Sequence, residues 1–374
     1  MSQYIHPFPA RMAPEIALQE LKSLKPGSVV VDPMVGSGTT LRAAELCRHQ
    51  AFGFDIDPLA VRIARGETEF IDASRLLTTG LTILKKLDGI DRRRLRRYPD
   101  HFDDETKDYG DYWFPRYNQT ILAFLADAIS SVRSDGARNA LELILSGTII
   151  VKQSGSSFAM DVAHSRPHIA HHLTPRPAEE LFLRRLRRVA AIYESRERLS
   201  DTRVCVKLTD CRRLPIPDSF ADMVITSPPY LNALDYMRGH RLSLIWLGYT
   251  LEQLRSTRSH TLGTENAGSY RVHHSDRESA IAERYSQDLG LMLQEVSRVL
   301  KPGGTFVCVI GDNAQSQLKN ATRIIRSCRQ AGLQLKSRRV RSIPAKRRYL
   351  PPPSAATGTA LDSRMVRETI LAFS

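Results

Sequence analysis

A glycine-containing turn between an apolar strand and a helix constrains the fold of this chain more than any other feature. The β-rich run from Ser28 to Val31 ends at Asp32-Pro33, and Gly36-Ser37-Gly38-Thr39-Thr40 leads into a predicted helix from Leu41 to Cys47. A second buried strand is predicted from Ala51 to Phe54. Gly36 and Gly38 have no Cβ, so a ligand can approach the backbone closely there. The pattern predicts a βαβ unit of a doubly wound, parallel α/β sheet.

Acidic residues near the predicted strand ends are candidates for ligand contact. Asp55 follows the glycines by about 20 residues, where a carboxylate can accept hydrogen bonds from ribose hydroxyls. Asp57 is a weaker candidate, or the cap of the following helix. Asp210, at the end of a third strand, could bind an adenine amino group or simply turn the chain. A dinucleotide fold would place a third glycine where Leu41 stands, which argues against a nicotinamide cofactor.

The α/β pattern is interrupted in the middle of the chain and then resumes. The interruption has helical periodicity, arginine clusters and no clear buried strand. After it, strands are predicted over Val204 to Leu208, Asp222 to Ile225 and Thr305 to Ile310. We therefore predict one α/β domain made of residues 1–65 and 203–374, with a mostly helical insertion of residues 66–202.

The five residues Thr226-Ser227-Pro228-Pro229-Tyr230 follow the apolar run Met223 to Ile225. A small polar acceptor, two prolines and an aromatic ring can hold a planar amine while one face of its base is stacked. That geometry suits transfer of a group onto a nucleobase amine. The alternative is an ordinary Pro-Pro turn that closes a strand.

The charge of the chain indicates a polyanionic partner. Its 374 residues include 54 Lys and Arg against 40 Asp and Glu, a formal net charge of +14. Such an excess attracts nucleic acid first and anionic membranes second. No apolar run approaches the ~20 residues of a membrane span, and the N-terminus lacks a signal-peptide layout. The sequence predicts a cytoplasmic, globular protein with no membrane partner.

No metal site is predicted. The five cysteines are scattered without a CxxC pair and are most simply buried apolar residues. His164, His168, His171 and His172 lie close together in the sequence, but they lack cysteine partners and a standard zinc spacing.

Together, the glycine loop, the acidic strand ends and the TSPPY motif resemble the amino-group DNA methyltransferases. These enzymes use S-adenosylmethionine to methylate exocyclic amines of cytosine or adenine. The resemblance implies a Rossmann-like class I methyltransferase fold, with helices on both faces of a mostly parallel sheet. It covers roughly residues 4–65 and 203–345 and is silent about the insertion.

The resemblance also assigns residues. The segment from His6 to Met12 matches the part that those enzymes place beside the methionine moiety of the cofactor. Its candidate cofactor-binding residues are His6 and Pro7. The cofactor loop is matched by Asp32, Pro33, Gly36, Ser37, Gly38, Thr39 and Thr40. Asp55 matches the ribose-binding acid, with Asp57 and Asp210 as further cofactor candidates. The catalytic motif is matched by Ser227, Pro228, Pro229 and Tyr230.

The chemistry explains why the motif needs these residues. An exocyclic amine is a poor nucleophile because its lone pair is delocalised into the ring. The Ser227 hydroxyl and the Pro228 carbonyl can each accept one amine hydrogen, which aims the lone pair at the sulfonium methyl. Pro228 and Pro229 fix the backbone, and Tyr230 can stack on a base that has left the duplex. No covalent intermediate is needed, and the Pro-Cys motif of ring-carbon methyltransferases is absent from the sequence.

Serine at the first motif position favours cytosine and its 4-amino group, because adenine enzymes more often carry aspartate or asparagine there. An adenine 6-amino DNA methyltransferase, an RNA guanine-amino methyltransferase and an inactive nucleic-acid-binding protein remain alternatives. We expect a prokaryotic, nucleoid-associated enzyme of DNA modification that acts on double-stranded DNA as a monomer or homodimer. A cognate restriction endonuclease is a candidate partner.

Candidate DNA contacts lie after the motif and near the C-terminus: Asn232, Tyr236, Arg238, Arg347 and Arg348. The alternative for the first three is a structured loop that leads into a helix. The insertion is the predicted target-recognition region, because its arginines and aromatic residues suit phosphate contact and base stacking. Arginine runs on helices are as often solvated faces.

Overall fold

The computed structural model describes residues 4–9, 11–170, 173–197, 202–229, 235–262, 274–312, 317–343 and 367–374. The chain divides into two compact units. Unit 1 comprises Met1–Pro9, Asp57–Ser200 and Leu234–His260, and unit 2 comprises Ala10–Ile56, Asp201–Ala233 and Thr261–Ser374. Unit 1 thus contains the predicted insertion up to Ser200, together with Met1–Pro9, residues 57–65 and Leu234–His260.

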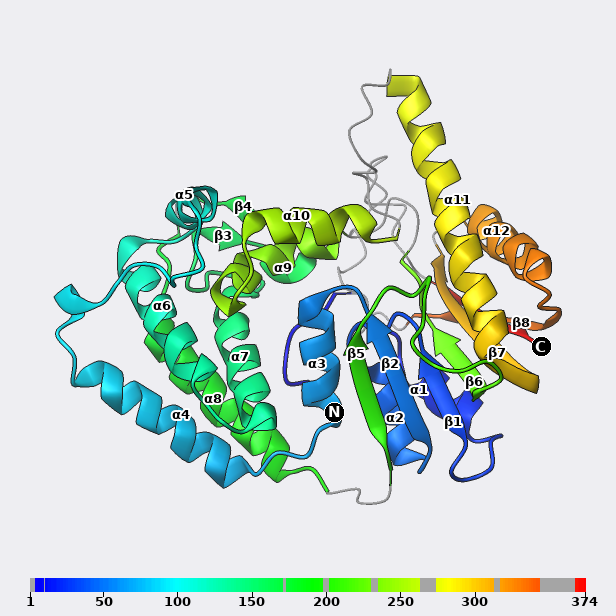
Figure 1. Ribbon diagram of the computed structural model, residues 1–374, viewed down its shortest axis with the longest axis horizontal. Helices are drawn as coiled ribbons and strands as arrows, with labels where there is room; N and C mark the ends of the chain where they lie inside the picture. The colour runs from blue at the N-terminus through cyan, green and yellow to red at the C-terminus, as the bar shows by residue number, and fades with distance from the viewer. Residues whose placement is uncertain are drawn as a thin grey trace. The chain divides into compact units, whose positions relative to one another are not determined.

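Unit 2 is built around the predicted sheet (Figure 1). Its helices are α1 (Pro14–Leu21), α2 (Thr39–Leu46), α11 (His274–Val299) and α12 (Gln317–Gln330). Its strands are β1 (Val29–Asp32), β2 (Gln50–Asp55), β5 (Val204–Leu208), β6 (Ala221–Thr226), β7 (Leu300–Asp312), β8 (Leu335–Ser342) and β9 (Arg367–Phe373).

The strands form one seven-stranded sheet in the order β5-β2-β1-β6-β7-β9-β8. The first five strands pair in parallel, and β9 runs antiparallel to both of its neighbours, β7 and β8. Parallel neighbours require crossovers, so their carboxyl ends meet at one edge of the sheet, here called the carboxyl edge. The predicted α/β class, with the mostly parallel sheet of a class I methyltransferase fold, is confirmed.

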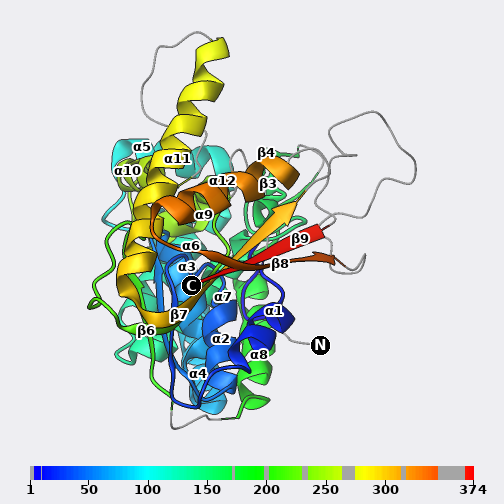
Figure 2. The same cartoon turned by 90° about the vertical axis from the view of Figure 1, so that its right-hand side faces the viewer.

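Helices cover both faces of this sheet. A Cβ on Gly53 would lie 2.6 Å from Leu41 of α2, so this position of β2 faces α2. The next residue back, Phe52, joins a buried cluster with Leu293 of α11 and Ile324 of α12. Successive strand residues point to opposite faces, so α2 covers one face and α11 with α12 the other. Figure 2 shows α11 and α12 together on one side of β7, β8 and β9.

Unit 1 is mostly helical. Its α-helices are α3 (Pro58–Thr68), α4 (Ala73–Asp88), α5 (Asp104–Trp113), α6 (Arg116–Ser130), α7 (Asp135–Ile149), α8 (Ala178–Glu194), α9 (Tyr236–Leu244) and α10 (Leu251–His260). Short pieces complete it: the 3-10 turns η1 (Arg92–Arg94), η2 (Val162–His164) and η3 (Ile245–Leu247), and the two-residue strands β3 (Ala159–Met160) and β4 (His168–Ile169).

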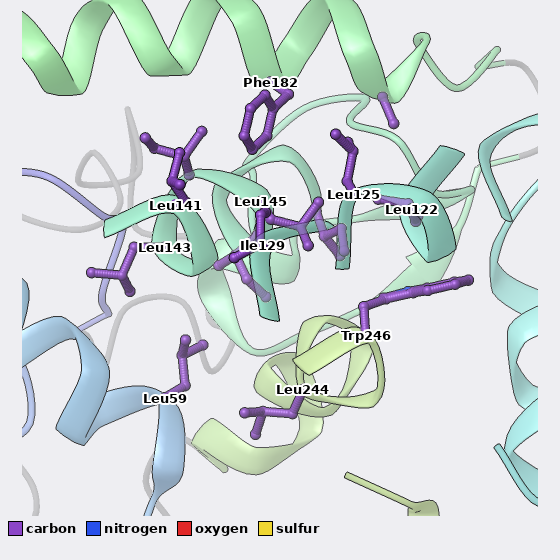
Figure 3. Packing of buried hydrophobic residues seen from close by; sticks show 14 of the residues in the cluster. Leu59, Leu122, Leu125, Ile129, Leu141, Leu143, Leu145, Phe182, Leu244 and Trp246 are labelled. Atoms are coloured by element: carbon purple, nitrogen blue, oxygen red, sulfur yellow. The ribbon is translucent and has the colours of Figure 1, made fainter. Parts of the chain in front are cut away.

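The core of unit 1 is a continuous apolar cluster, part of which is drawn in Figure 3. Trp246 lies in it, with its ring 5.2 Å from the rings of both Phe102 and Phe114. Leu145 of α7 and Phe182 of α8 are fully buried in the same cluster. Burial of so many large side chains gives unit 1 a core of its own.

None of the helices that the structure describes is long and apolar enough to cross a membrane.

Most predicted elements occur where the sequence placed them, with shifted ends. The strand Val204–Leu208 is observed as predicted. The sequence also predicts a helix from about Ser279 to Leu300, and the observed helix, α11, begins earlier, at His274. The sequence further predicts a helix through His240 to Leu247. The observed helix, α9, begins at Tyr236, because the Asp235 side chain caps it by accepting from the Arg238 backbone N–H. The strands of the β3–β4 pair were not predicted.

Candidate active site

Four parallel strands bring predicted site residues to the carboxyl edge of unit 2. Asp32 ends β1, Asp55 ends β2 and Thr226 ends β6. The pairing register sets Val31 of β1 beside Val224 of β6. The Asp55 position lies beside the last residue of β5, two residues before Asp210. The glycine loop, the acidic strand ends and the TSPPY motif therefore meet at one edge of one sheet.

The glycine loop is held across the end of β2 by backbone hydrogen bonds. The Gly36 N–H donates to Oδ2 of Asp55 at 2.9 Å, and the Val35 N–H donates to the Phe54 carbonyl at 2.8 Å. Gly36 and Gly38 adopt φ values of +48° and +77°, the left-handed region that favours glycine. The loop thus needs its glycines for conformation as well as for close approach.

The residues that follow the loop begin α2. Gly38 occupies its N-cap position, and Thr39 and Thr40 form the first turn as buried side chains. The hydroxyls of Ser37 and Thr39 lie 3.0 Å apart within hydrogen-bonding distance. The N-terminus of α2, with its backbone N–H groups, therefore lies directly after the loop.

Asp32 connects the glycine loop to β6, the strand that precedes the TSPPY motif. Its side chain is 4% exposed and accepts hydrogen bonds from the Thr226 hydroxyl at 2.8 Å and from the Met34 N–H at 3.1 Å. Burial raises the pKa of Asp32 to about 6, although these hydrogen bonds lower it. The residue immediately before Ser227 is thereby tied to the carboxylate at the start of the loop. The sequence analysis missed this bond, which joins residues 194 positions apart.

The motif itself follows β6 without a break. Ser227 and Pro229 are half-buried and Pro228 is buried. The Pro229 carbonyl accepts a hydrogen bond at 3.1 Å from the hydroxyl of Tyr285 on α11. Tyr285 was not predicted, and no local signal marks it, because it lies in a different element of the sequence. Tyr230 and Asn232 lie outside the described residues.

Asp210 is part of an ion-paired group. Arg212 contacts its carboxylate at 2.6 Å and contacts Asp288 of α11 at 2.5 Å. The predicted contact of Asp210 with an adenine amino group stays a prediction, and it would have to coexist with this ion pair. Sequence reasoning found Asp210 but neither of its neighbours in the group.

The other predicted residues lie in unit 1. His6 is buried, and its Nε2 lies 2.9 Å from the Ser146 hydroxyl. Pro7 follows it, with its carbonyl 2.6 Å from Nδ1 of His6. Tyr236 stacks on Phe8, with ring centroids 5.2 Å apart. These contacts fix the segment around His6 within the helical unit.

Asp57 caps α3, the alternative that the sequence left open. Its carboxylate accepts from the Leu59 N–H at 2.8 Å and contacts Nδ1 of the buried His240 at 2.5 Å. Burial alone would raise the pKa of Asp57, but the nearby His240 and the backbone N–H donors lower it overall. Its role in cofactor binding stays a prediction.

The remaining DNA candidates are divided between described and undescribed residues. Nε of Arg238 lies 4.0 Å from Asp235 and the Arg238 side chain is 43% exposed. Arg347, Arg348, His171 and His172 lie outside the described residues. Within the described ranges, no three His, Cys, Asp or Glu side chains are placed to hold a metal ion.

Comparison with known proteins agrees with the motifs. Residues 2–66 match the N6/N4 family model described as DNA methylase. The chain is 22% identical to the type II methyltransferase M.MvaI of Kocuria varians, over 86% of this chain and 79% of that protein. It is 25% identical to the type II methyltransferase M.BsoBI of Geobacillus stearothermophilus, over 63% of this chain and 50% of that protein.

Among solved structures, a SAM-dependent methyltransferase from Aquifex aeolicus aligns with a TM-score of 0.36 and 10% identity, over 98% of this chain and 94% of that one. Our fold assignment rests on the strand order rather than on this likeness. The predicted resemblance to the amino-group DNA methyltransferases is confirmed at the level of the N6/N4 family and of distant type II relatives.

Proposed function

We propose that this protein is a site-specific DNA methyltransferase that transfers a methyl group from S-adenosylmethionine to the 4-amino group of a flipped-out cytosine. The observation that carries the proposal is the junction at the carboxyl edge. There Thr226, directly before Ser227, is hydrogen-bonded to Asp32, directly before the glycine loop. A cofactor loop and an amine-binding motif joined in this way can align a methyl donor with an acceptor nitrogen.

The residues present fit S-adenosylmethionine. Ribose hydroxyls are donors, and the Asp55 carboxylate at the end of β2 is an acceptor. Asp32 and Asp55 give this edge a negative character that suits a cationic ligand, whereas the charge of Asp210 is balanced by Arg212. When bound, S-adenosylmethionine supplies an electrophilic methyl group on a positively charged sulfur. Gly36 and Gly38 leave the backbone open on the side of the ligand.

The motif residues have distinct tasks in this proposal. The Ser227 hydroxyl and the Pro228 carbonyl accept the two amine hydrogens and localise the lone pair on nitrogen. The Pro229 carbonyl is already bound by Tyr285, which holds the motif in one conformation. Tyr230 stacks on the flipped base. The bond from nitrogen to the methyl group would form as the sulfur–methyl bond breaks, which would leave a neutral thioether, and the methylated nitrogen would lose one hydrogen as a proton to water. Rate is gained by positioning and electrostatics.

The nature of the product tests the proposal. Purified protein is incubated with radiolabelled methyl donor and either unmethylated duplex DNA or transfer RNA, and the nucleic acid is digested to nucleosides. We expect label in 4-methylcytosine. Label in 6-methyladenine would move the target to adenine, and methylguanine from RNA would refute DNA as the substrate. Cofactor binding without any incorporation would indicate an inactive binding protein.

Two substitutions separate catalysis from cofactor binding. Ser227→Ala should lower kcat roughly 100-fold, in the range seen for loss of one preorganised hydrogen-bonding group, with little change in cofactor affinity. Asp55→Ala should weaken cofactor binding by about 10- to 100-fold, because a charged acceptor is removed. Ser23→Ala, at an exposed serine of unit 2, is the matched control. Full activity of Ser227→Ala would refute the assigned amine acceptor.

A further inference from the structure

The positive charge of this protein is concentrated in its C-terminal part. The segment from Gln317 to Ser374 contains 13 of the 54 Lys and Arg residues and 2 of the 40 Asp and Glu residues. It therefore contributes +11 of the net charge of +14. The predicted insertion, residues 66–202, contains 21 basic and 20 acidic residues and contributes +1. The attraction for polyanions therefore originates mainly outside the insertion.

Several arginines of the insertion are neutralised by carboxylates within unit 1. Arg96 contacts Asp100 and Asp127, and Arg97 contacts Asp111. Further pairs join Arg92 to Glu179, Arg138 to Asp135 and Arg196 to Glu67. An arginine already bound to a carboxylate is a weaker partner for phosphate, because the new contact must replace the old one.

Two basic residues of α12 face the solvent. Ala321, Ile324 and Cys328 are buried and attach the helix to the sheet, whereas Arg326 and Arg329 are exposed. The helix has no acidic residue along its whole length. It therefore presents cations on its outer side with no carboxylate of its own to neutralise them.

The edge strand β8 divides its arginines between the two faces of the sheet. Arg339 and Arg341 are paired with Glu20 of α1 and Glu368 of β9. Arg338 lies beside Leu371, whose side chain belongs to the cluster under α12. Cross-strand neighbours share a face, so Arg338 lies on the face of α12.

Lys336 and Arg338 are both exposed, as are Arg326 and Arg329 on the helix. Among the described residues, no carboxylate lies within 4.0 Å of any of these four cations. We define Arg326, Arg329, Lys336 and Arg338 as the C-terminal basic surface. Figure 2 shows α12 beside β8 and β9.

We propose that the C-terminal basic surface binds the phosphate backbone of double-stranded DNA. The 14 residues of α12 span about 21 Å, the length of about six base pairs. Arg326 and Arg329 lie within one turn near the end of this helix, and Lys336 and Arg338 lie on the neighbouring strand β8. Unpaired, exposed cations on a helix and an adjacent strand suit the regularly spaced phosphates of a duplex. The choice of duplex DNA over other polyanions rests on the proposed function. The surface itself rests on the distribution of charge.

The test compares two triple variants that each remove three positive charges. Arg326→Gln/Arg329→Gln/Arg338→Gln changes the C-terminal basic surface. Arg92→Gln/Arg96→Gln/Arg138→Gln changes arginines of unit 1 that are paired with carboxylates. For the full-length protein, affinity for a fluorescent duplex of about 25 base pairs is measured from about 50 to 300 mM salt. For each phosphate that the variant no longer neutralises, the slope of log K against log salt should fall by about 0.9.

We expect the first variant to show a slope smaller by about two to three units and to bind at least roughly tenfold more weakly. The second variant should change the slope by less than one unit. Cofactor binding and thermal melting of both variants, measured in parallel, establish that each remains folded. An equal or larger slope change in the second variant, or an unchanged slope in the first, overturns the proposal.

Two further measurements separate this proposal from the proposed function and from a membrane partner. If wild-type protein methylates no DNA, yet the first variant still shows the reduced salt slope on duplex, the basic surface stands and the enzymatic assignment fails. If wild-type protein methylates DNA but the first variant shows an unchanged salt slope, the enzymatic assignment stands and the proposed role of the basic surface fails. Tighter binding of wild-type protein to anionic phosphatidylserine vesicles than to duplex, at equal salt, would also overturn the proposal.

Discussion

The buried carboxylate of Asp32 should make unit 2 less stable at neutral pH than at mildly acidic pH. Its pKa is raised from 3.8 to about 6, chiefly because burial disfavours the charged form. The folded protein therefore binds a proton more tightly than the unfolded chain between these values. The stability contribution of this group falls as pH rises through that window. Asp32→Asn removes the titration while keeping an oxygen acceptor for Thr226 and Met34.

The magnitude follows from the two pKa values. Near pH 7.5 the Asp32 carboxyl is ionised in both the folded and the unfolded chain. There the difference between its two pKa values lowers the free energy of unfolding by about 3 kcal/mol. At about pH 4.5, where Asp32 is mostly protonated in the folded protein, the same effect lowers the free energy of unfolding by only about 1 kcal/mol. The stability of Asp32→Asn relative to wild type should therefore rise by about 2 kcal/mol over this range.

The assay is urea unfolding of both proteins across this pH range, followed by far-ultraviolet circular dichroism. Hydrogen exchange of peptides from β1 and β6 would show that the effect originates in unit 2. A difference between variant and wild type that does not change with pH would refute the reasoning. So would a variant that is the less stable protein at pH 7.5. Cofactor binding should not improve along with stability, because Asp32 lies at the cofactor loop.

Two other substitutions test particular contacts. Tyr285→Phe removes the donor to the Pro229 carbonyl. We expect a several-fold lower kcat, unchanged cofactor affinity and a loss of about 1 kcal/mol in stability. Loss of stability with unchanged kcat would contradict the positioning role of Tyr285. Trp246→Ala empties the centre of the unit 1 core and should cost about 3–5 kcal/mol. Fluorescence of the other tryptophan, Trp113, reports that unfolding within unit 1, and an unchanged midpoint would show that the core had been misassigned.

The local chemistry of the sequence was sufficient to predict the turn of the glycine loop and the position of the TSPPY motif at a strand end. The strand–Gly36-x-Gly38–helix pattern depends on backbone freedom and on hydrophobic periodicity, which act over a few residues. The same holds for Thr226 to Pro229 at the end of a buried strand. Because parallel strands present their carboxyl ends at one edge, the predicted α/β class is consistent with the observed position of Asp32, Asp55 and Ser227 at that edge.

Only the tertiary structure decided which partners these residues have. The bonds from Thr226 to Asp32 and from Tyr285 to Pro229 join distant segments, and no local pattern encodes which donor reaches which acceptor. The charges show the same division. The sequence alone determined the net charge of +14. Folding decided that Arg96 and Arg97 meet carboxylates while Arg326 and Arg338 face solvent, because pairing depends on the side chains that packing brings within reach.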